Sequence, residues 1–259
     1  MALPPAIVAM LGGVVLAAGA LTGIAGFGFA MLGTMALAMA IDPATAVVFM
    51  ILPVLSVNLS LITDLSLEEL HTCGRRFAPL VLAALVGSIV GIVALDVVPA
   101  APLRVGLGLL SLGFVATTQE AIELPGRDRI EDGCFVETTP AMVGVGGISG
   151  LIFGGTNVGV QLIAYIRSCE LSHSLFIGVV AMVFLGLNAI RAGAAGLLGL
   201  YPSMTLIGLS VAAAVPAVIG VAIGKRLRDR IAERHRRLTV LGLLALIGGR
   251  LLLAGLGIA

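Results

Sequence analysis

Three polar side chains lie inside apolar stretches of the sequence, where their chemistry is the main reason for interest in them. Arg191, Asn58 and Asn188 are each surrounded by apolar residues, and Gln161 is a weaker example. A guanidinium donates two parallel hydrogen bonds to an oxyanion, and an amide both donates and accepts. These residue types point to recognition of a small anion. The alternatives are that Arg191 extends to a polar surface and that each amide joins two helices.

Two glycine-rich breaks interrupt the apolar stretches. The first break contains Gly23, Gly26 and Gly28, and the second reads Gly154-Gly155-Thr156-Asn157. A helix that begins at such a break leaves free backbone N–H groups at the positive end of its dipole. These groups suit an anion, and the second break adds a hydroxyl and an amide. The alternative is that the glycines only permit close helix packing.

The composition indicates what surrounds these residues. Of the 259 residues, 59% are apolar and 11% are charged, and the mean hydropathy is +1.16. Soluble domains carry about 25% charged residues, so this chain could not cover a soluble fold. We predict an all-α polytopic membrane protein, with residues 1–259 forming one transmembrane domain in a lipid bilayer. In that setting an internal arginine marks a functional site by default.

Polar stretches divide the chain into segments of helical length. Residues 119–137 include six acidic and two basic residues and are predicted to be a central linker. Asp42-Pro43 predicts a helix start, with the aspartate as its cap. The predicted segments are residues 4–21, 29–41, 43–63, 77–97, 103–118, 139–151, 158–166, 173–198, 204–224 and 238–256.

The order of the segments indicates an internal duplication. Residues 1–118 and 138–259 each contain a short pair of segments split by glycines and then three longer segments. Asn58 and Asn188 occupy corresponding segments, and residues 108–112 echo residues 242–246. The shared order of these features favours two structural repeats.

The basic residues predict which side of the membrane each loop faces. Residues 225–237 carry seven Lys and Arg side chains, so we place this stretch and the central linker in the cytoplasm. The turn at Arg167 falls on the same side as the central linker. The split pair of segments between the linker and this turn must therefore enter and leave the membrane on the cytoplasmic side. Each half then crosses the membrane an odd net number of times, so the two repeats are predicted to be inverted relative to each other. Both termini are predicted to lie outside. The charges leave open whether the short pairs are re-entrant or fully spanning.

The sequence contains none of the usual signatures of catalysis or metal binding. Cys73, Cys134 and Cys169 are far apart and lack metal-ligand spacing. We therefore expect no catalytic residue, no metal, no cofactor and no nucleic-acid partner.

Several stretches resemble one known family. Residues 21–29 (LTGIAGFGF) and then 42–46 (DPATA) are similar to the opening of the sulfite exporter TauE/SafE family, and residues 150–157 (GLIFGGTN) and 171–174 (LSHS) to its second signature. The resemblance implies a bacterial-type inner-membrane permease for sulfite, sulfoacetate and other organosulfonates. The family often has three consecutive glycines at each break. Here Phe27 interrupts the first set and Thr156 ends the second, which affects the expected substrate.

We therefore expect a secondary transporter, an exporter of sulfur-containing oxyanions, that works by alternating access. The alternatives are an anion channel built on the same halves and a permease for another small organic anion. The expected partners are a small anionic substrate and the lipid bilayer, with a homodimer as a further option. The predicted substrate-binding residues are Gly23, Gly26, Gly28, Asn58, Gly154, Gly155, Thr156, Asn157, Asn188 and Arg191.

Overall fold

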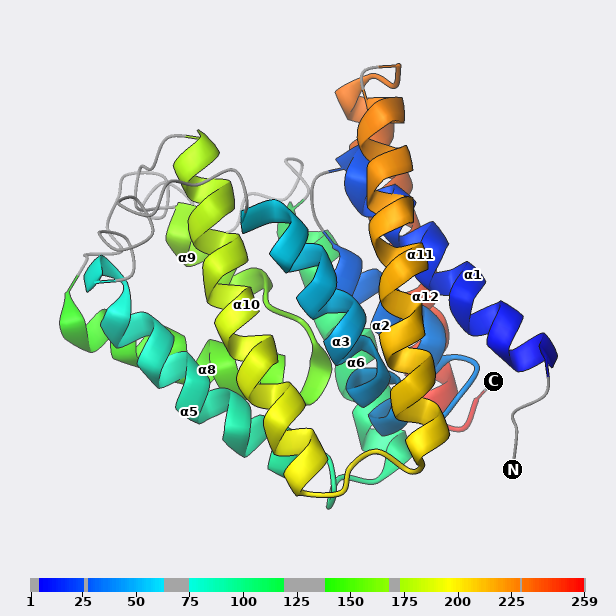
Figure 1. The fold of residues 1–259 in the computed structure, drawn as a ribbon, viewed down its shortest axis with the longest axis horizontal. Helices are drawn as coiled ribbons and strands as arrows, with labels where there is room; N and C mark the ends of the chain where they lie inside the picture. Colours follow the sequence, from blue (N-terminus) through cyan, green and yellow to red (C-terminus); the bar gives the residue numbers. More distant parts are fainter. Residues whose placement is uncertain are drawn as a thin grey trace.

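The computed structural model describes residues 5–25, 28–62, 75–118, 138–167, 173–228 and 230–258, and every regular element in these ranges is an α-helix (Figure 1). Six helices are long and apolar enough to cross a membrane. The predicted class is confirmed, and the chain is a multi-pass membrane protein. The first half contains α1 (Pro5–Ala25), α2 (Phe29–Ala38), α3 (Pro43–Ile62), α5 (Ala78–Ala94) and α6 (Ala100–Thr118), and the second contains α8 (Thr139–Thr156), α9 (Val160–Arg167), α10 (His173–Leu197), α11 (Met204–Arg228) and α12 (Glu233–Gly255).

Some predicted features lie outside the described residues. The central linker and all three cysteines belong to this group, as does the glycine at position 26.

The helix boundaries differ from the prediction at both glycine-rich breaks. Helix α1 continues to Ala25 and α8 continues through Gly154 and Gly155 to Thr156. The second interruption is therefore at residues 157–159 rather than at the glycines. Glycine can occur inside a membrane helix, where the missing Cβ lets another helix approach closely. The short helices that follow have 10 and 8 residues, about 15 and 12 Å, so neither spans a bilayer alone.

The basic stretch near the end of the chain is mostly helical, whereas it was predicted as a loop. Lys225, Arg226 and Arg228 form the last turn of α11, and α12 begins at Glu233. Cations stabilise the negative end of a helix dipole, so this composition suits a helix C-terminus as well as a membrane surface.

The helix start predicted at Asp42 is confirmed. Its carboxylate accepts hydrogen bonds from the backbone N–H of Thr45 at 2.9 Å and from the Thr45 hydroxyl at 3.1 Å. Pro43 occupies the first helical position, where a missing N–H costs nothing.

The two halves exchange their helices in a reciprocal way. Helix α1 packs along α11 and α8 along α5, so the first helix of each half lies on the fourth helix of the other. Figure 1 shows these pairs on opposite sides of α3 and α10, which also pack together. Helices α6 and α12 form a further pair between the halves. This reciprocity agrees with a repeated structure, and the inversion of the repeats stays a prediction.

Glycines make the exchanged pairs very close. A Cβ placed on Gly23 of α1 would lie 2.8 Å from the Cα of Gly224 in α11, and one placed on Gly154 of α8 would lie 2.9 Å from the Cα of Gly91 in α5. No larger side chain fits at such distances, so the backbones themselves are in contact.

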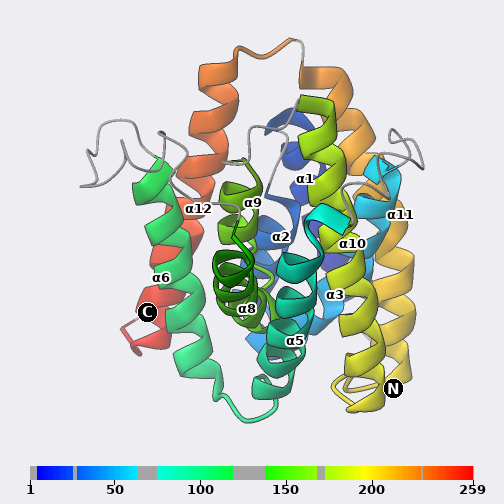
Figure 2. The same ribbon diagram turned by 90° about the vertical axis from the view of Figure 1, so that its left-hand side faces the viewer.

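The chain ends and turns are distributed between two faces. Figure 2 shows both chain ends in the lower half, with the α5–α6 and α10–α11 turns at the lower edge and the α11–α12 turn at the upper edge. The molecule thus has one face carrying the basic helix ends and an opposite face carrying the termini.

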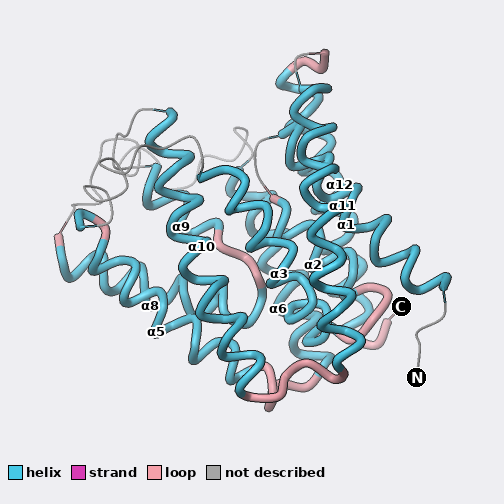
Figure 3. The backbone as a smooth tube through the Cα atoms, in the orientation of Figure 1, coloured by secondary structure: helices cyan, strands magenta, loops and turns pink. Residues whose placement is uncertain are grey.

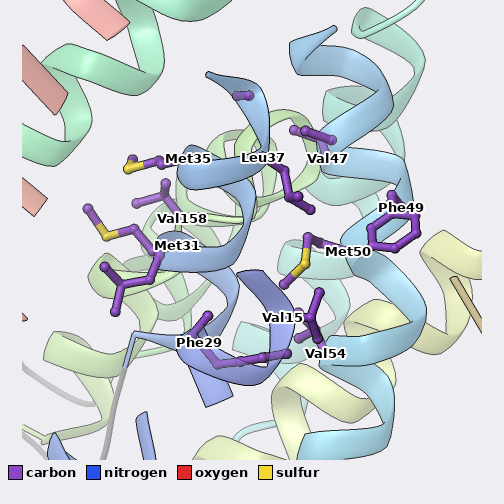
Figure 4. Packing of buried hydrophobic residues seen from close by; sticks show 14 of the residues in the cluster. Val15, Phe29, Met31, Met35, Leu37, Val47, Phe49, Met50, Val54 and Val158 are labelled. Carbon is purple, nitrogen blue, oxygen red and sulfur yellow. The ribbon is translucent and has the colours of Figure 1, made fainter. Parts of the chain in front are cut away.

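A core of apolar side chains holds α2 and α3 against the second half. Figure 4 shows Met50 of α3 beside Leu37 of α2, and Val158 beside Met31 and Met35. Met50 fits because Gly33 has no side chain, since a Cβ there would lie within 3.1 Å of the Met50 sulfur. Val158 follows the end of α8, so this core fixes the second break in the interior (Figure 3).

Candidate functional site

Arg191 is the largest fully buried side chain in the described part of the protein. It lies on α10, six residues or about 9 Å before the helix ends at Leu197. The side chain turns inward and has no exposed surface. The alternative that it extends to the membrane surface is therefore wrong in this structure.

The guanidinium of Arg191 is bound by three neutral oxygen atoms. Its Nη1 donates to Asn157 Oδ1 at 2.6 Å and to Asn188 Oδ1 at 3.2 Å, and its Nη2 donates to the Gly154 carbonyl at 2.8 Å. The Phe153 ring lies beneath it, with the guanidinium carbon 4.7 Å from the ring centroid. Each of these interactions reduces the cost of burying the cation, but none supplies a full negative charge.

Asn157 connects the second break to the first half. Its amide nitrogen donates to the Thr34 hydroxyl on α2 at 2.8 Å and to the Val47 carbonyl on α3 at 2.9 Å. Its backbone is left-handed, with φ of 59°, a conformation that asparagine tolerates better than most residues. Both amide hydrogens and the carbonyl oxygen are thus used, and Asn157 orients Arg191 from two helices of the other half.

Asn188 and Thr156 complete the surroundings of Arg191. The amide nitrogen of Asn188 donates to the Phe184 carbonyl at 2.8 Å, which directs its oxygen to Arg191. The Thr156 hydroxyl donates to the Ile152 carbonyl at 2.5 Å and accepts from the Val158 N–H at 3.2 Å. Thr156 therefore satisfies backbone groups on both sides of the break.

At the second break, the group that provides positive charge differs from the expectation. The sequence analysis expected free backbone N–H groups at a helix N-terminus to provide it. The Gly154 carbonyl lies at the C-terminal end of α8, where the helix dipole is negative. Arg191 binds that carbonyl directly, so the positive group presented here is the guanidinium. Whether Gly154, Gly155, Thr156, Asn157, Asn188 and Arg191 bind substrate stays a prediction, but four of them share one hydrogen-bonded cluster.

The first break has a simpler construction. Gly23 lies against the α11 backbone, as the packing interpretation expects, and Gly28 has a left-handed φ of 98° immediately before α2. The side chain of Arg236 on α12 reaches the Ile24 carbonyl near the end of α1, at 3.4 Å. This contact places an arginine at the C-terminal carbonyls of α1, as Arg191 is placed for α8.

Asn58 lies apart from the Arg191 cluster in its hydrogen bonding. It is half-buried near the end of α3, and its side chain makes no hydrogen bond to any described residue. A role in substrate binding for Asn58, Gly23 and Gly28 stays a prediction.

Sequence reasoning did not select Thr34 and Phe153 as site residues. Thr34 is fully buried and accepts the Asn157 hydrogen bond. It is the one polar residue among residues 29–41, and that isolation was a usable signal. Phe153 precedes the second break, but nothing in the sequence indicates which face of α8 turns toward α10.

The comparisons with known proteins agree with this architecture. The family model described as sulfite exporter TauE/SafE matches residues 11–251, which include all ten of the described helices in part or in full. No curated protein and no solved structure matches the chain. The matched family is a family of membrane transporters of sulfur-containing anions, not of enzymes. The match covers nearly the whole chain, and the protein belongs to the sulfite exporter TauE/SafE family.

Proposed function

We propose that the protein is a secondary transporter that exports sulfur-containing oxyanions, such as sulfite or organosulfonates, and binds them at Arg191. The observation that carries this proposal is a fully buried arginine whose hydrogen-bond partners among the described residues are all neutral. Leaving a buried charge without a counter-charge costs several kcal/mol. An anionic substrate would supply that counter-charge, and a guanidinium binds oxyanions through paired hydrogen bonds.

Alternating access is the mechanism that best fits a site shared by two exchanged halves. Asn157 belongs to the second half and is hydrogen-bonded to Thr34 and Val47 of the first. A movement of one half against the other would therefore change the surroundings of Arg191 directly. The exchanged pairs α1–α11 and α5–α8 are the bodies that would move, because their glycine contacts make each pair rigid.

The proposed orientation puts the basic helix ends of α11 and α12 in the cytoplasm and both termini outside a bacterial-type inner membrane. The support is the density of basic residues in 225–237. With the cell interior negative, anion export is favoured by about 2.3 kcal/mol per charge per 100 mV. Export then needs no coupling ion, and flux at a clamped potential should be independent of a proton gradient.

The first experiment measures thermal unfolding of the purified protein in detergent. Sodium salts of sulfite, thiosulfate, sulfoacetate, sulfate, phosphate and nitrate are added in turn. A ligand at 100 times its dissociation constant stabilises the folded protein by about 2.7 kcal/mol. We expect this with a sulfur oxyanion and its loss in Arg191→Lys, which keeps a charge but loses the fork of donors. Arg250→Gln is the matched control, since Arg250 is exposed on α12.

Flux into proteoliposomes then tests the transport mode. Saturation with concentration and exchange against internal substrate would support a carrier. Flux that rises linearly without exchange would identify a channel. If no anion changes the unfolding temperature of the wild-type protein, the proposal of an anion site at Arg191 is wrong.

A further inference from the structure

Helix α3 contains a proline at a position where the helix would otherwise form a backbone hydrogen bond. Pro53 lies inside α3 and has no N–H, so it cannot donate to the carbonyl of Phe49, four residues earlier. Phe49 has no exposed surface, and a buried carbonyl without a partner costs about as much free energy as a lost hydrogen bond. The Phe49 carbonyl therefore needs a donor from outside its helix.

Ser210 of α11 provides that donor. Its hydroxyl donates to the Phe49 carbonyl at 2.6 Å, and the serine has no exposed surface. Ser88 of α5, the fourth helix of the other half, is equally buried, but its hydroxyl donates to the Leu85 carbonyl of its own helix at 2.9 Å. Helix α10, the counterpart of α3, contains no proline. The bond between Ser210 and a proline-freed carbonyl is thus specific to α3 and α11.

One short stretch of α3 accepts hydrogen bonds from both exchanged helix pairs. Ser210, from the α1–α11 pair, donates to Phe49, and Asn157, at the end of α8 in the α5–α8 pair, donates to the Val47 carbonyl at 2.9 Å. Asn157 accepts in turn from Arg191 at 2.6 Å. A continuous series of contacts therefore leads from α11 through one turn of α3 to the guanidinium.

An apolar cavity of about 170 Å³ lies beside Phe49. Ala212 and Pro216 of α11 also line it. Pro216 is inside its helix, so it cannot donate to the Ala212 carbonyl four residues earlier. Proline inside a helix is a common cause of a bend, and each of the two helices lacks one backbone hydrogen bond next to the same cavity. The cavity gives both helices space to change their bend.

We infer that Ser210 is a positioning residue for the Arg191 site, which links α3 at Pro53 to α11 so that movement of the α1–α11 pair reaches Asn157. This inference rests on the proposed transport at Arg191 and adds a residue that acts through α3 and not by direct contact with the guanidinium. When α11 moves, the Ser210 hydroxyl moves the adjoining turn of α3 with it. The Val47 carbonyl then shifts relative to Asn157, and the donors of Arg191 are aligned or released as the halves move.

The test is a double-mutant cycle between Ser210→Ala and Pro53→Ala. Alanine at position 53 restores the N–H that bonds the Phe49 carbonyl, so the Ser210 hydroxyl no longer replaces a missing donor. Affinity for sodium sulfite, thiosulfate and sulfoacetate is measured by isothermal titration calorimetry in detergent. Ser210→Ala alone should weaken binding about fivefold, a typical effect for a residue that carries coupling without touching the ligand. In the Pro53→Ala protein the same substitution should change affinity less than about twofold.

The matched control is Ser88→Ala, which removes an equally buried hydroxyl that bonds only its own helix and should change affinity less than about twofold. The unfolding temperature of each variant separates positioning from a purely structural role. A Ser210→Ala protein that unfolds at a lower temperature but keeps wild-type affinity would overturn the inference. Equal losses of affinity with and without Pro53 would overturn it too. If Ser210→Ala alone does not fold, recovery of folded protein in the double variant would support the link, and no recovery would count against it.

A second cycle needs no anion. Asn157→Gly removes the amide and keeps the left-handed backbone, which glycine adopts readily. Effects of distant, independent substitutions on the free energy of unfolding add, so Ser210→Ala and Asn157→Gly should be less than additive if Ser210 acts through Asn157. Additive effects would contradict the inference. If the wild-type protein binds no anion, the proposed function fails, and this cycle still decides whether Ser210 is coupled to Asn157.

Discussion

The two glycine-rich breaks each have an arginine at the end of the preceding helix, but the two arginines differ in burial and in their other contacts. At each break an arginine donates to a carbonyl near the end of the preceding helix, Arg236 to Ile24 and Arg191 to Gly154. The first contact is long at 3.4 Å and part-buried, while the second is 2.8 Å and fully buried. The comparison teaches that a buried arginine with its own amide partners, and not a glycine break alone, distinguishes a candidate anion site.

A second difference is the residue that adopts the left-handed backbone. At the first break it is Gly28 and at the second it is Asn157. Glycine provides only the conformation, whereas asparagine also hydrogen-bonds α2, α3 and Arg191. The second break is therefore coupled to both halves, and the first is coupled mainly through packing.

The largest predicted effect separates the two arginines. Arg191→Gln removes the buried charge and should weaken binding of a sulfur oxyanion about 100-fold or more, because truncating a buried charged contact costs about 2–5 kcal/mol. Arg236→Gln should change affinity less than about threefold, since Arg236 lies at the basic face. Calorimetric titration of both variants checks this. Equal losses would mean that the two breaks share the substrate.

The next effect tests whether the glycine contacts of the two halves are equivalent. Gly23→Ala and Gly154→Ala should each lower the free energy of unfolding by about 1–3 kcal/mol, because overpacking forces the helices apart. Gly12→Ala and Gly144→Ala are controls, since no atom lies within 4 Å of a Cβ at either position. Thermal or denaturant unfolding in detergent measures the difference. A neutral effect at one site alone would show that only one exchanged pair is rigid.

A smaller effect distinguishes the two corresponding asparagines. Asn188→Asp puts a carboxylate where an amide oxygen lies 3.2 Å from Arg191 Nη1, so an internal ion pair would compete with the anion. We expect about a tenfold loss of affinity. If the Arg191 cluster alone binds the anion, Asn58→Asp should leave affinity within about threefold, because Asn58 has no hydrogen bond to that cluster, and a larger loss would support the predicted substrate contact at Asn58. Unchanged binding in Asn188→Asp would contradict the idea that substrate provides the missing counter-charge.

Much of the helix layout could be predicted from residue types alone. The apolar segments, the Asp42 cap and the pairing of Asn58 with Asn188 as helix counterparts all depend on local composition or on order along the chain. The predicted positions of the two breaks differ from the observed ones by a few residues, because a glycine within a helix cannot be distinguished by sequence from a glycine in a loop. Only the neighbouring backbone, α11 at Gly23 and α5 at Gly154, decides between them.

The site was partly predictable for the same reason. Arg191 could be selected because an isolated cation in an apolar segment is costly wherever it points. Thr34 and Phe153 could not be assigned to it, because their contacts depend on which helices cross at the second break.

The sequence by itself determined that this chain is embedded in a lipid bilayer and how many apolar segments it has. It also determined that Arg191 must either be buried or extend to a polar surface. These follow from transfer free energies, which belong to residue types and their order. Only the tertiary structure decided that Arg191 turns inward and that Asn157 links it to the first half. The physical reason is that hydrogen bonds and close contacts depend on distances between helices that are far apart in the chain.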